Sequence, residues 1–265
     1  VVVGDRPDTH VGEVLLGYNN AADTVADAPV PADRSQAERL GWLRNGSFLV
    51  MRKYHQDVAM MRERVEAAAQ ALLAGRSAEA PMTPDAAREE VYAKMMGRYR
   101  SGKPLADLYA GGGSNDFGYD ADPRGERCPL HAHIRRAHPR QDAAPGERPP
   151  RLMRRSMAYG PPASDTSSDE RGLLFMAFNA SLSEQFEVVQ RWLAGGNSTG
   201  SSSGQSCPIV GVPDASHARQ YRFVHDDDGT LKPLTMTLDV LPRLYEEPRT
   251  LTRLEWGMYL FTPSL

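Results

Sequence analysis

The sequence is poor in cysteine, in long apolar runs and in charge of one sign. Its two cysteines, Cys128 and Cys207, cannot form the disulfide framework that holds many small secreted domains together. No stretch of about 18 or more apolar residues occurs, which excludes an ordinary transmembrane helix. The net charge is −3, with acidic and basic residues mixed along the chain. This mixture excludes the strong uniform field that attracts nucleic acid or an anionic membrane, so neither is expected as a partner.

The start of the chain, VVVGDRPDTH, has no initiator Met and no basic-then-apolar signal pattern. Such a start indicates a processed chain or a piece of a longer polypeptide. Together with the low cysteine count, it favours a soluble protein that is cytoplasmic rather than secreted. The 265 residues, 40% of them apolar, are enough for one large domain or two small ones with a hydrophobic core.

Apolar residues recur with two different periods, which predicts a mixed α+β fold. Residues 47–51 (SFLVM) and 173–178 (LLFMAF) are short apolar runs typical of buried strands. Apolar residues at every third or fourth position predict a helix over residues 57–74. Also expected are a helix near 83–97, strands over 152–159 and 256–261, and a helix from Ser181 or Ser183 to Leu193. This order of elements predicts a ferredoxin-like fold, a split βαβ plan with long inserted loops.

A cluster of one cysteine and three histidines stands in an irregular stretch, residues 111–151. The segment CPLHAHIRRAHPR (128–140) contains Cys128, His131, His133 and His138. One interpretation is a zinc site, but structural zinc takes paired ligands at two separated knuckles, and no second cluster is present. Another is a set of surface histidines that bind nothing.

A third interpretation needs one histidine only, because haem iron takes a single neutral imidazole on one side. The propionates of a haem need cations, its face needs apolar contacts, and peroxide cleavage on its other side needs a fixed cation. Candidates for these three tasks are, in turn, Arg135, Arg136 and Arg140; Leu152, Met153, Leu173 and Phe175; and Arg154 or Arg155. The residue types alone leave the three interpretations open.

Longer stretches of the chain carry a resemblance that separates these interpretations. The sequence closely resembles the dye-decolorising peroxidase family, in the branch with longer loops, over nearly its whole length. The segment around Cys128-Pro129 and Ala132-His133-Ile134-Arg135 is the most specific. The matching stretches, in family order, are GEVLLGY (12–18), RNGSFLVMRKYHQDV (44–58), MMGRYRSGKPL (95–105), NDFGYDADPRGERCPLHAHIRRAHPR (115–140), RLMRRSMAYG (151–160), RGLLFMAFNASLSEQFEVVQRWL (171–193) and LEWGMYLFTPSL (254–265).

The resemblance implies a haem b cofactor (iron protoporphyrin IX) and a role for each of several residues. His133 corresponds to the histidine that binds iron, whereas His131 and His138 correspond to positions without ligands. Arg154, rather than Arg155, corresponds to the arginine on the other side of the haem. Leu173 and Phe175 correspond to the apolar pair there, and Arg135 and Arg140 remain candidates for the propionates.

The resemblance also implies a domain organisation. Family members have two ferredoxin-like domains of the dimeric α+β barrel type, and the haem is bound mainly by the C-terminal domain. Residues 44–265 correspond to this C-terminal domain, and residues 1–43 correspond to a lead-in from the inter-domain segment. An N-terminal domain or partner chain is therefore expected outside this sequence.

Two departures from the family pattern bear on function. The family's G-x-x-D-G motif, whose aspartate handles the peroxide proton, is absent from the 265 residues; Asp5 and Asp8 lie nearest to its place, without the glycines. Cys207, in CPIVG (207–211), replaces an aspartate that relatives often carry. An acidic partner would raise electron donation from the iron-binding imidazole, so this contact is in question.

The sequence therefore predicts one of two functions. The first is a haem peroxidase that uses hydrogen peroxide to oxidise dyes, phenolics or other bulky, aromatic electron donors. The second is a haem-binding module, or half of a split peroxidase, with little turnover alone because the G-x-x-D-G aspartate is absent. The natural reducing substrate is not encoded in any motif.

Overall fold

The structure, a computed structural model, describes most of the chain in two compact units. One unit is drawn from Val1–Gln56, Arg148–Gln190 and Leu254–Leu265, and the other from Asp57–Glu147 and Arg191–Arg253. The predicted boundary at residues 43 and 44 stays a prediction. Asp5, Asp8 and most of the predicted lead-in lie outside the described residues. The described residues are 10–20, 41–79, 81–106, 115, 117–140, 149–162, 164, 170–196, 204–214, 216–240 and 248–264.

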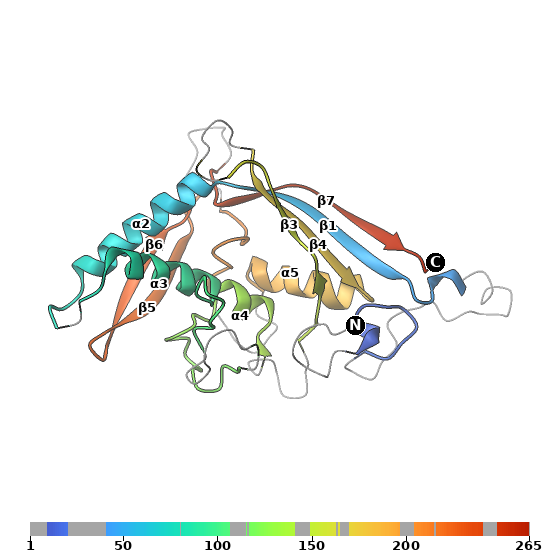
Figure 1. Ribbon diagram of the computed structural model, residues 1–265, viewed down its shortest axis with the longest axis horizontal. Coiled ribbons are helices and arrows are strands. Elements are labelled where there is room, and N and C mark those ends of the chain that lie inside the picture. The colour runs from blue at the N-terminus through green and yellow to red at the C-terminus, as the bar shows by residue number, and fades with distance from the viewer. Residues whose placement is uncertain are drawn as a thin grey trace. The chain divides into compact units, whose positions relative to one another are not determined.

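The first unit is built on an antiparallel sheet. Strand β1 (Ser47–Gln56) pairs along its length with β4 (Gly172–Asn179), and β7 (Thr252–Thr262) continues the sheet beyond β1. The short strands β2 (Met153–Arg154) and β3 (Met157–Tyr159) pair with the other edge of β4. Figure 1 shows β1 in blue between β4 and β7.

This strand order confirms the predicted ferredoxin-like topology. Along the chain come β1, helix α2, the β2–β3 pair, β4, helix α5 (Glu187–Ala194) and β7. The first strand lies between the third and the fourth in the sheet, as the split βαβ plan requires. The barrel type expected from the resemblance is not seen, because the described strands form open sheets.

The predicted helices have clear start and stop signals. Helix α2 (Val58–Ala74) begins after Asp57, whose carboxylate accepts a 2.8 Å hydrogen bond from the amide N–H of Met60. Helix α3 (Pro84–Met96) begins after Thr83 with a proline in its first turn, and it ends at Gly97, where φ is +91°. None of the described helices has the length and apolar character that crossing a membrane requires.

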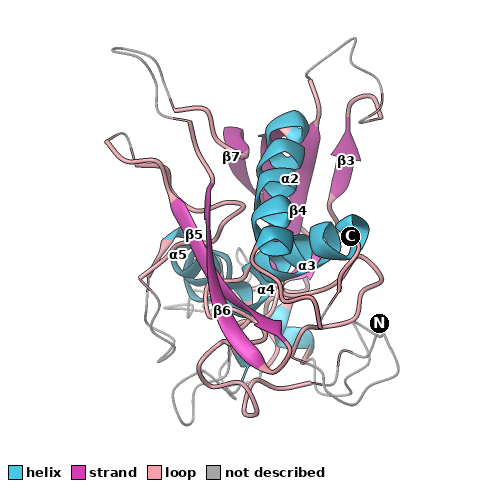
Figure 2. Cartoon of the chain, turned by 90° about the vertical axis from the view of Figure 1, so that its left-hand side faces the viewer, coloured by secondary structure: helices cyan, strands magenta, loops and turns pink. Residues whose placement is uncertain are grey.

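The second unit also contains a hairpin that the sequence analysis missed. Strands β5 (Gln220–Asp227) and β6 (Thr230–Thr237) pair antiparallel and are drawn as long strands in Figure 2. Asp228 and Gly229 connect them with φ of +52° and +77°, the left-handed conformation of a two-residue hairpin turn. Apolar side chains of the hairpin join α2 and α3 in the core of this unit, whose fully buried members include Met60, Leu72, Met95, Tyr221 and Leu238.

Candidate functional site

His133 is the first residue of a five-residue helix, α4 (His133–Ala137), in the second unit. A turn in which the amide of Ala132 bonds the carbonyl of Pro129 at 2.9 Å leads into this helix. The imidazole is partly exposed, and its Nδ1 lies 3.2 Å from the Sγ of Cys207. The histidine predicted to bind iron and the cysteine that stands in place of an acid are therefore in direct contact.

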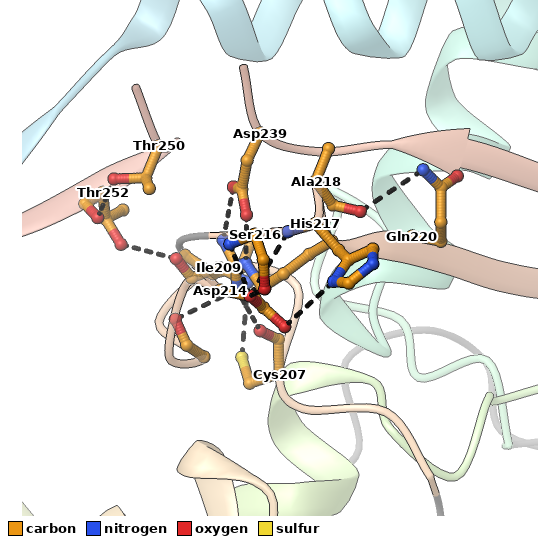
Figure 3. A network of polar contacts seen from close by, with 12 residues as sticks. Cys207, Ile209, Asp214, Ser216, His217, Ala218, Gln220, Asp239, Thr250 and Thr252 are labelled. Atoms are coloured by element: carbon orange, nitrogen blue, oxygen red, sulfur yellow. Dashed lines mark hydrogen bonds and ion pairs between the residues drawn. The ribbon is translucent and has the colours of Figure 1, made fainter. Parts of the chain in front are cut away.

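Cys207 is fully buried and held from several sides (Figure 3). Its amide donates to the carbonyl of Leu193 at 2.9 Å, and its own carbonyl accepts from Gly211 N at 2.9 Å and from Arg219 at 3.2 Å. Asp239 in turn binds Arg219 through both carboxylate oxygens, at 2.6 and 2.8 Å. Burial raises the pKa of the Cys207 thiol to about 11, so the thiol is neutral at ordinary pH.

Arg135 braces the loop that precedes α4. Its side chain is fully buried, and its guanidinium bonds the carboxylate of Asp122 at 3.1 Å and the carbonyls of Asp122 and Cys128 at 2.9 and 2.7 Å. It also lies over the ring of Tyr119, 4.3 Å from the ring centroid. These contacts favour a structural role for Arg135 over the predicted role towards a haem propionate.

Asp122, which the sequence analysis did not select, is the centre of this loop. Its carboxylate accepts hydrogen bonds from the amides of Arg127 at 3.1 Å and Cys128 at 2.9 Å in addition to the bond from Arg135. Since three donors converge on one buried carboxylate, Asp122 fixes the turn that leads into α4.

Arg136 connects α4 to the segment that leads to Cys207. Its buried guanidinium donates to the carbonyls of Trp192 at 3.0 Å, Gly196 at 2.9 Å and Gln205. Burial lowers its pKa, although the group stays charged because arginine titrates far above neutral pH. Arg136 therefore fixes the segment that precedes Cys207, and so helps to position Cys207 beside His133.

Arg140 is the more exposed of the two predicted propionate arginines. It is partly buried, donates to the carbonyl of Phe117 at 2.9 Å and lies 3.8 Å from the centroid of that ring. Its backbone φ of +55° is in the left-handed region.

The other two histidines of the cluster have different surroundings from His133. His131 is buried, with Nε2 2.7 Å from the carbonyl of Arg222 and its ring edge-on to Tyr221. Burial lowers the pKa of His131 to about 4. His138 follows the last residue of α4. Within the described part of the chain, no group of three or more His, Cys, Asp and Glu side chains is placed to hold a metal ion.

In the first unit, the sheet places three of the predicted residues on one face. Leu173 and Phe175 are two residues apart in β4, so their side chains point the same way. Arg154 pairs with Ala177, two residues further along β4, and residues directly opposite in an antiparallel pair share a face. Arg155 is displaced by one residue and belongs to the opposite face. The register therefore groups Arg154, not Arg155, with Leu173 and Phe175.

A second arginine on this face was not predicted. Arg52 in β1 lies opposite Phe175, so the two side chains share a face. Its guanidinium contacts Gln190 at 3.3 Å and lies 4.7 Å from the ring centroid of Phe186, which is itself 5.9 Å from that of Phe175. Arg154 is exposed, whereas the guanidinium of Arg52 binds Gln190 and packs against Phe186.

Comparison with protein families gives one match that covers most of the chain. A family model described as Dyp-type peroxidase, C-terminal, matches residues 18–202. Among curated proteins, the dye-decolorizing peroxidase of Mycena epipterygia is 31% identical over 98% of this chain and 57% of its own. The multifunctional dye peroxidase DyP2 of an Amycolatopsis species is 38% identical over 55% of this chain and 33% of its own.

Solved structures of dye-decolorizing peroxidases have a fold similar to that of this chain. DyP2 from Amycolatopsis matches 99% of this chain and 53% of its own, with a TM-score of 0.63 and 27% identity. A dye-decolorizing peroxidase in complex with 2,6-dimethoxyphenol matches 95% of this chain and 54% of its own, with a TM-score of 0.63 and 25% identity. The chain thus spans about half the length of the Mycena relative and of these two solved proteins.

Proposed function

Because the chain belongs to the Dyp-type peroxidase family, whose members are haem enzymes, we propose that it is the haem-binding part of a peroxidase. The reaction would use hydrogen peroxide to oxidise bulky aromatic donors such as dyes and phenolics. A relative solved with 2,6-dimethoxyphenol supports the phenolic class. The natural donor of this chain is left open by the proposal.

The observation that carries the proposal is the environment of His133. A haem ligand must offer one ring nitrogen to iron while the other is fixed by a hydrogen-bond partner. His133 meets this description, because its Nδ1 contacts Cys207 and its ring is partly exposed at the start of α4. The donor chemistry of the described residues therefore fits a haem iron held by Nε2 of His133. Bound haem would supply the redox chemistry that no side chain provides.

Arg154, Leu173 and Phe175 are proposed to line the peroxide side. Leu173 and Phe175 would keep water from that face, and the guanidinium of Arg154 would stabilise negative charge on the peroxide oxygen that departs. Arginine stays protonated at any working pH, so Arg154 would act as a fixed cation and could not take the peroxide proton. The shared face of these side chains in the sheet supports this grouping.

Of the two propionate candidates, Arg140 fits the task better. Arg140 is a partly exposed residue, whereas the side chain of Arg135 is fully buried and bonded to Asp122. We therefore assign Arg140 to a propionate carboxylate and Arg135 to the support of α4.

The roles of Arg154 and Arg155 are separated by one pair of matched variants. In protein reconstituted with haem, Arg154→Leu should slow the reaction with peroxide by on the order of 100-fold, because one charge-stabilising donor is lost. Arg155→Leu removes the same charge from the opposite face of the sheet and should change the rate little. Stopped-flow mixing with hydrogen peroxide measures both rates. A larger defect in Arg155→Leu would show that the proposed grouping is wrong.

The second candidate function is haem binding without rapid turnover. It is favoured by the absence of a G-x-x-D-G motif from the 265 residues, since a positioned carboxylate contributes roughly 10²–10⁴-fold to proton transfer. A chain extended upstream by a segment with that motif and a first ferredoxin-like domain should then react with peroxide much faster. Equal rates for the two chains would favour the peroxidase function of the 265 residues alone.

A further inference from the structure

We propose that Sγ of Cys207 accepts a hydrogen bond from Nδ1–H of His133, fixes the tautomer of that imidazole, and makes it a weaker electron donor to iron than a carboxylate partner would. The first two parts concern this chain alone. The last part rests on the proposed haem function.

Two donors converge on the sulfur of Cys207. The amide N–H of Ile209 points to Sγ at 3.4 Å, and Nδ1 of His133 lies 3.2 Å from the same atom. A backbone amide can only donate, so the sulfur is already an acceptor in one of the two contacts. A sulfur that accepts from Ile209 can accept a second bond from a protonated Nδ1 of His133, and this is the direction that the proposal takes. Donation from the thiol S–H to Nδ1 is the alternative that the NMR test decides.

The position of the sulfur is fixed by the fold around it. Leu193, Gly211 and Arg219 bond the backbone of Cys207, and the Asp239 carboxylate holds Arg219 with both oxygens. The Asp239 carboxylate is thus engaged by Arg219, and Figure 3 shows Asp239 and Cys207 within one network of polar contacts. The atom of Cys207 that lies 3.2 Å from Nδ1 of His133 is Sγ.

The tautomer decides which nitrogen can bind a metal ion. A neutral imidazole carries one proton, so a proton on Nδ1 leaves the lone pair of Nε2 for iron. If the thiol donated to Nδ1 instead, the proton would lie on Nε2 and would block iron binding. The direction of this one hydrogen bond is therefore a functional property of the site.

The chemical nature of the acceptor sets how strongly the imidazole donates to iron. Hydrogen bonds to an ionised acceptor are roughly twice as strong as those between neutral groups, and sulfur in a thiol is a weak acceptor. A carboxylate would draw the Nδ1 proton away and enrich the ring in electrons, whereas the thiol does so only slightly. The reduced form of a haem on His133 should therefore be favoured relative to a site with a carboxylate.

The first test needs no haem. Nitrogen-15 NMR of the imidazole, assigned through loss of its signals in His133→Gln, reports which nitrogen carries the proton. We expect the Nδ1–H tautomer in the wild type and a mixture with more Nε2–H in Cys207→Ala. A wild-type ring protonated at Nε2, or tautomers unchanged in Cys207→Ala, would overturn the proposal.

The second test measures the reduction potential of the haem-loaded protein. Cys207→Asp should lower the potential by at least a tenfold change in the reduction equilibrium, about 59 mV for one electron, and should raise the iron–histidine stretching frequency. Cys207→Ser, a neutral variant of similar size, should shift both in the same direction by less. Cys128→Ala, at the other buried cysteine, should shift neither.

The outcomes of the two tests are distinguishable. Equal potentials in the wild type and Cys207→Asp would overturn the electronic part of the proposal while the haem function stands. If the wild type retained no haem, the proposed function would fail, and the NMR measurement would still decide the direction of the hydrogen bond.

Discussion

Removal of the Asp122 carboxylate should destabilise the loop that leads into α4 more than any surface substitution. Asp122 accepts bonds from Arg135 at 3.1 Å and from the amides of Arg127 and Cys128 at 3.1 and 2.9 Å. Its side chain is 4% exposed and that of Arg135 is 0% exposed, so water cannot replace the lost partner. Asp122→Ala would remove the carboxylate that binds this buried guanidinium.

The expected loss in the free energy of unfolding follows from the burial of this ion pair. Breaking a buried ion pair by removal of one partner costs about 3–5 kcal/mol, because the remaining charge stays desolvated. A suitable control in the same unit is Arg88→Ala, since Arg88 pairs with Glu66 and Asp85 and is 35% exposed. Surface pairs of this kind contribute about 0.2–1 kcal/mol. Asp122→Asn should cost less than Asp122→Ala, because the amide oxygen still accepts from the backbone.

Denaturant unfolding of the three variants and the wild type measures these differences in the free energy of unfolding. The expected order of destabilisation is Asp122→Ala, then Asp122→Asn, then Arg88→Ala. If Asp122→Ala lost no more than about 1 kcal/mol, the guanidinium of Arg135 would have another counter-charge or access to water. The structural role assigned to Arg135 would then be refuted.

Three further predictions address other parts of the second unit. A hydrogen bond from Lys232 holds the pKa of Asp227 below its ordinary value of 3.8. The ionised carboxylate therefore stabilises the fold above pH 3.8, and this stabilisation is lost as the pH falls through the lowered pKa of the folded protein. Thermal unfolding should show Asp227→Asn less stable than wild type near about pH 6 and equally stable in strong acid. His131→Ala should keep the haem absorption band but lower the free energy of unfolding by about 1–3 kcal/mol, because the carbonyl of Arg222 loses its partner; a lost band would instead make His131 a ligand. Elemental analysis of haem-loaded protein should find about one iron per chain. Stoichiometric zinc would instead support the interpretation of the cysteine–histidine cluster as a zinc site.

The periodic elements of the fold could be predicted from sequence because each is encoded locally. The helix expected over 57–74 and the strand expected over 173–178 match α2 and β4 within one residue at each end. The β5–β6 hairpin was missed, although Asp228–Gly229 between alternating apolar residues is a strong local signal for such a turn.

The candidate site was predictable only where a motif marks it. The resemblance singled out His133 and placed Cys207 where relatives often carry an acidic partner of that imidazole. Periodicity alone encodes no such pair, because the two residues are 74 positions apart. The ion pair of Arg135 with Asp122 depends in the same way on how an irregular loop folds. By contrast, the register of β2 on β4 places Arg154 on the same face of the sheet as Leu173 and Phe175, because a shift of one residue, as to Arg155, changes the face.

The central claim is that Nε2 of His133 binds haem iron, and a cavity variant tests it most directly. His133→Gly removes the ring while His131 and His138 remain. Haem titration followed by absorption spectroscopy should show about one haem retained per wild-type chain. The variant should retain none until free imidazole is added, which would restore the wild-type band. A His133→Gly protein that holds haem with an unchanged spectrum in the absence of imidazole would contradict the claim.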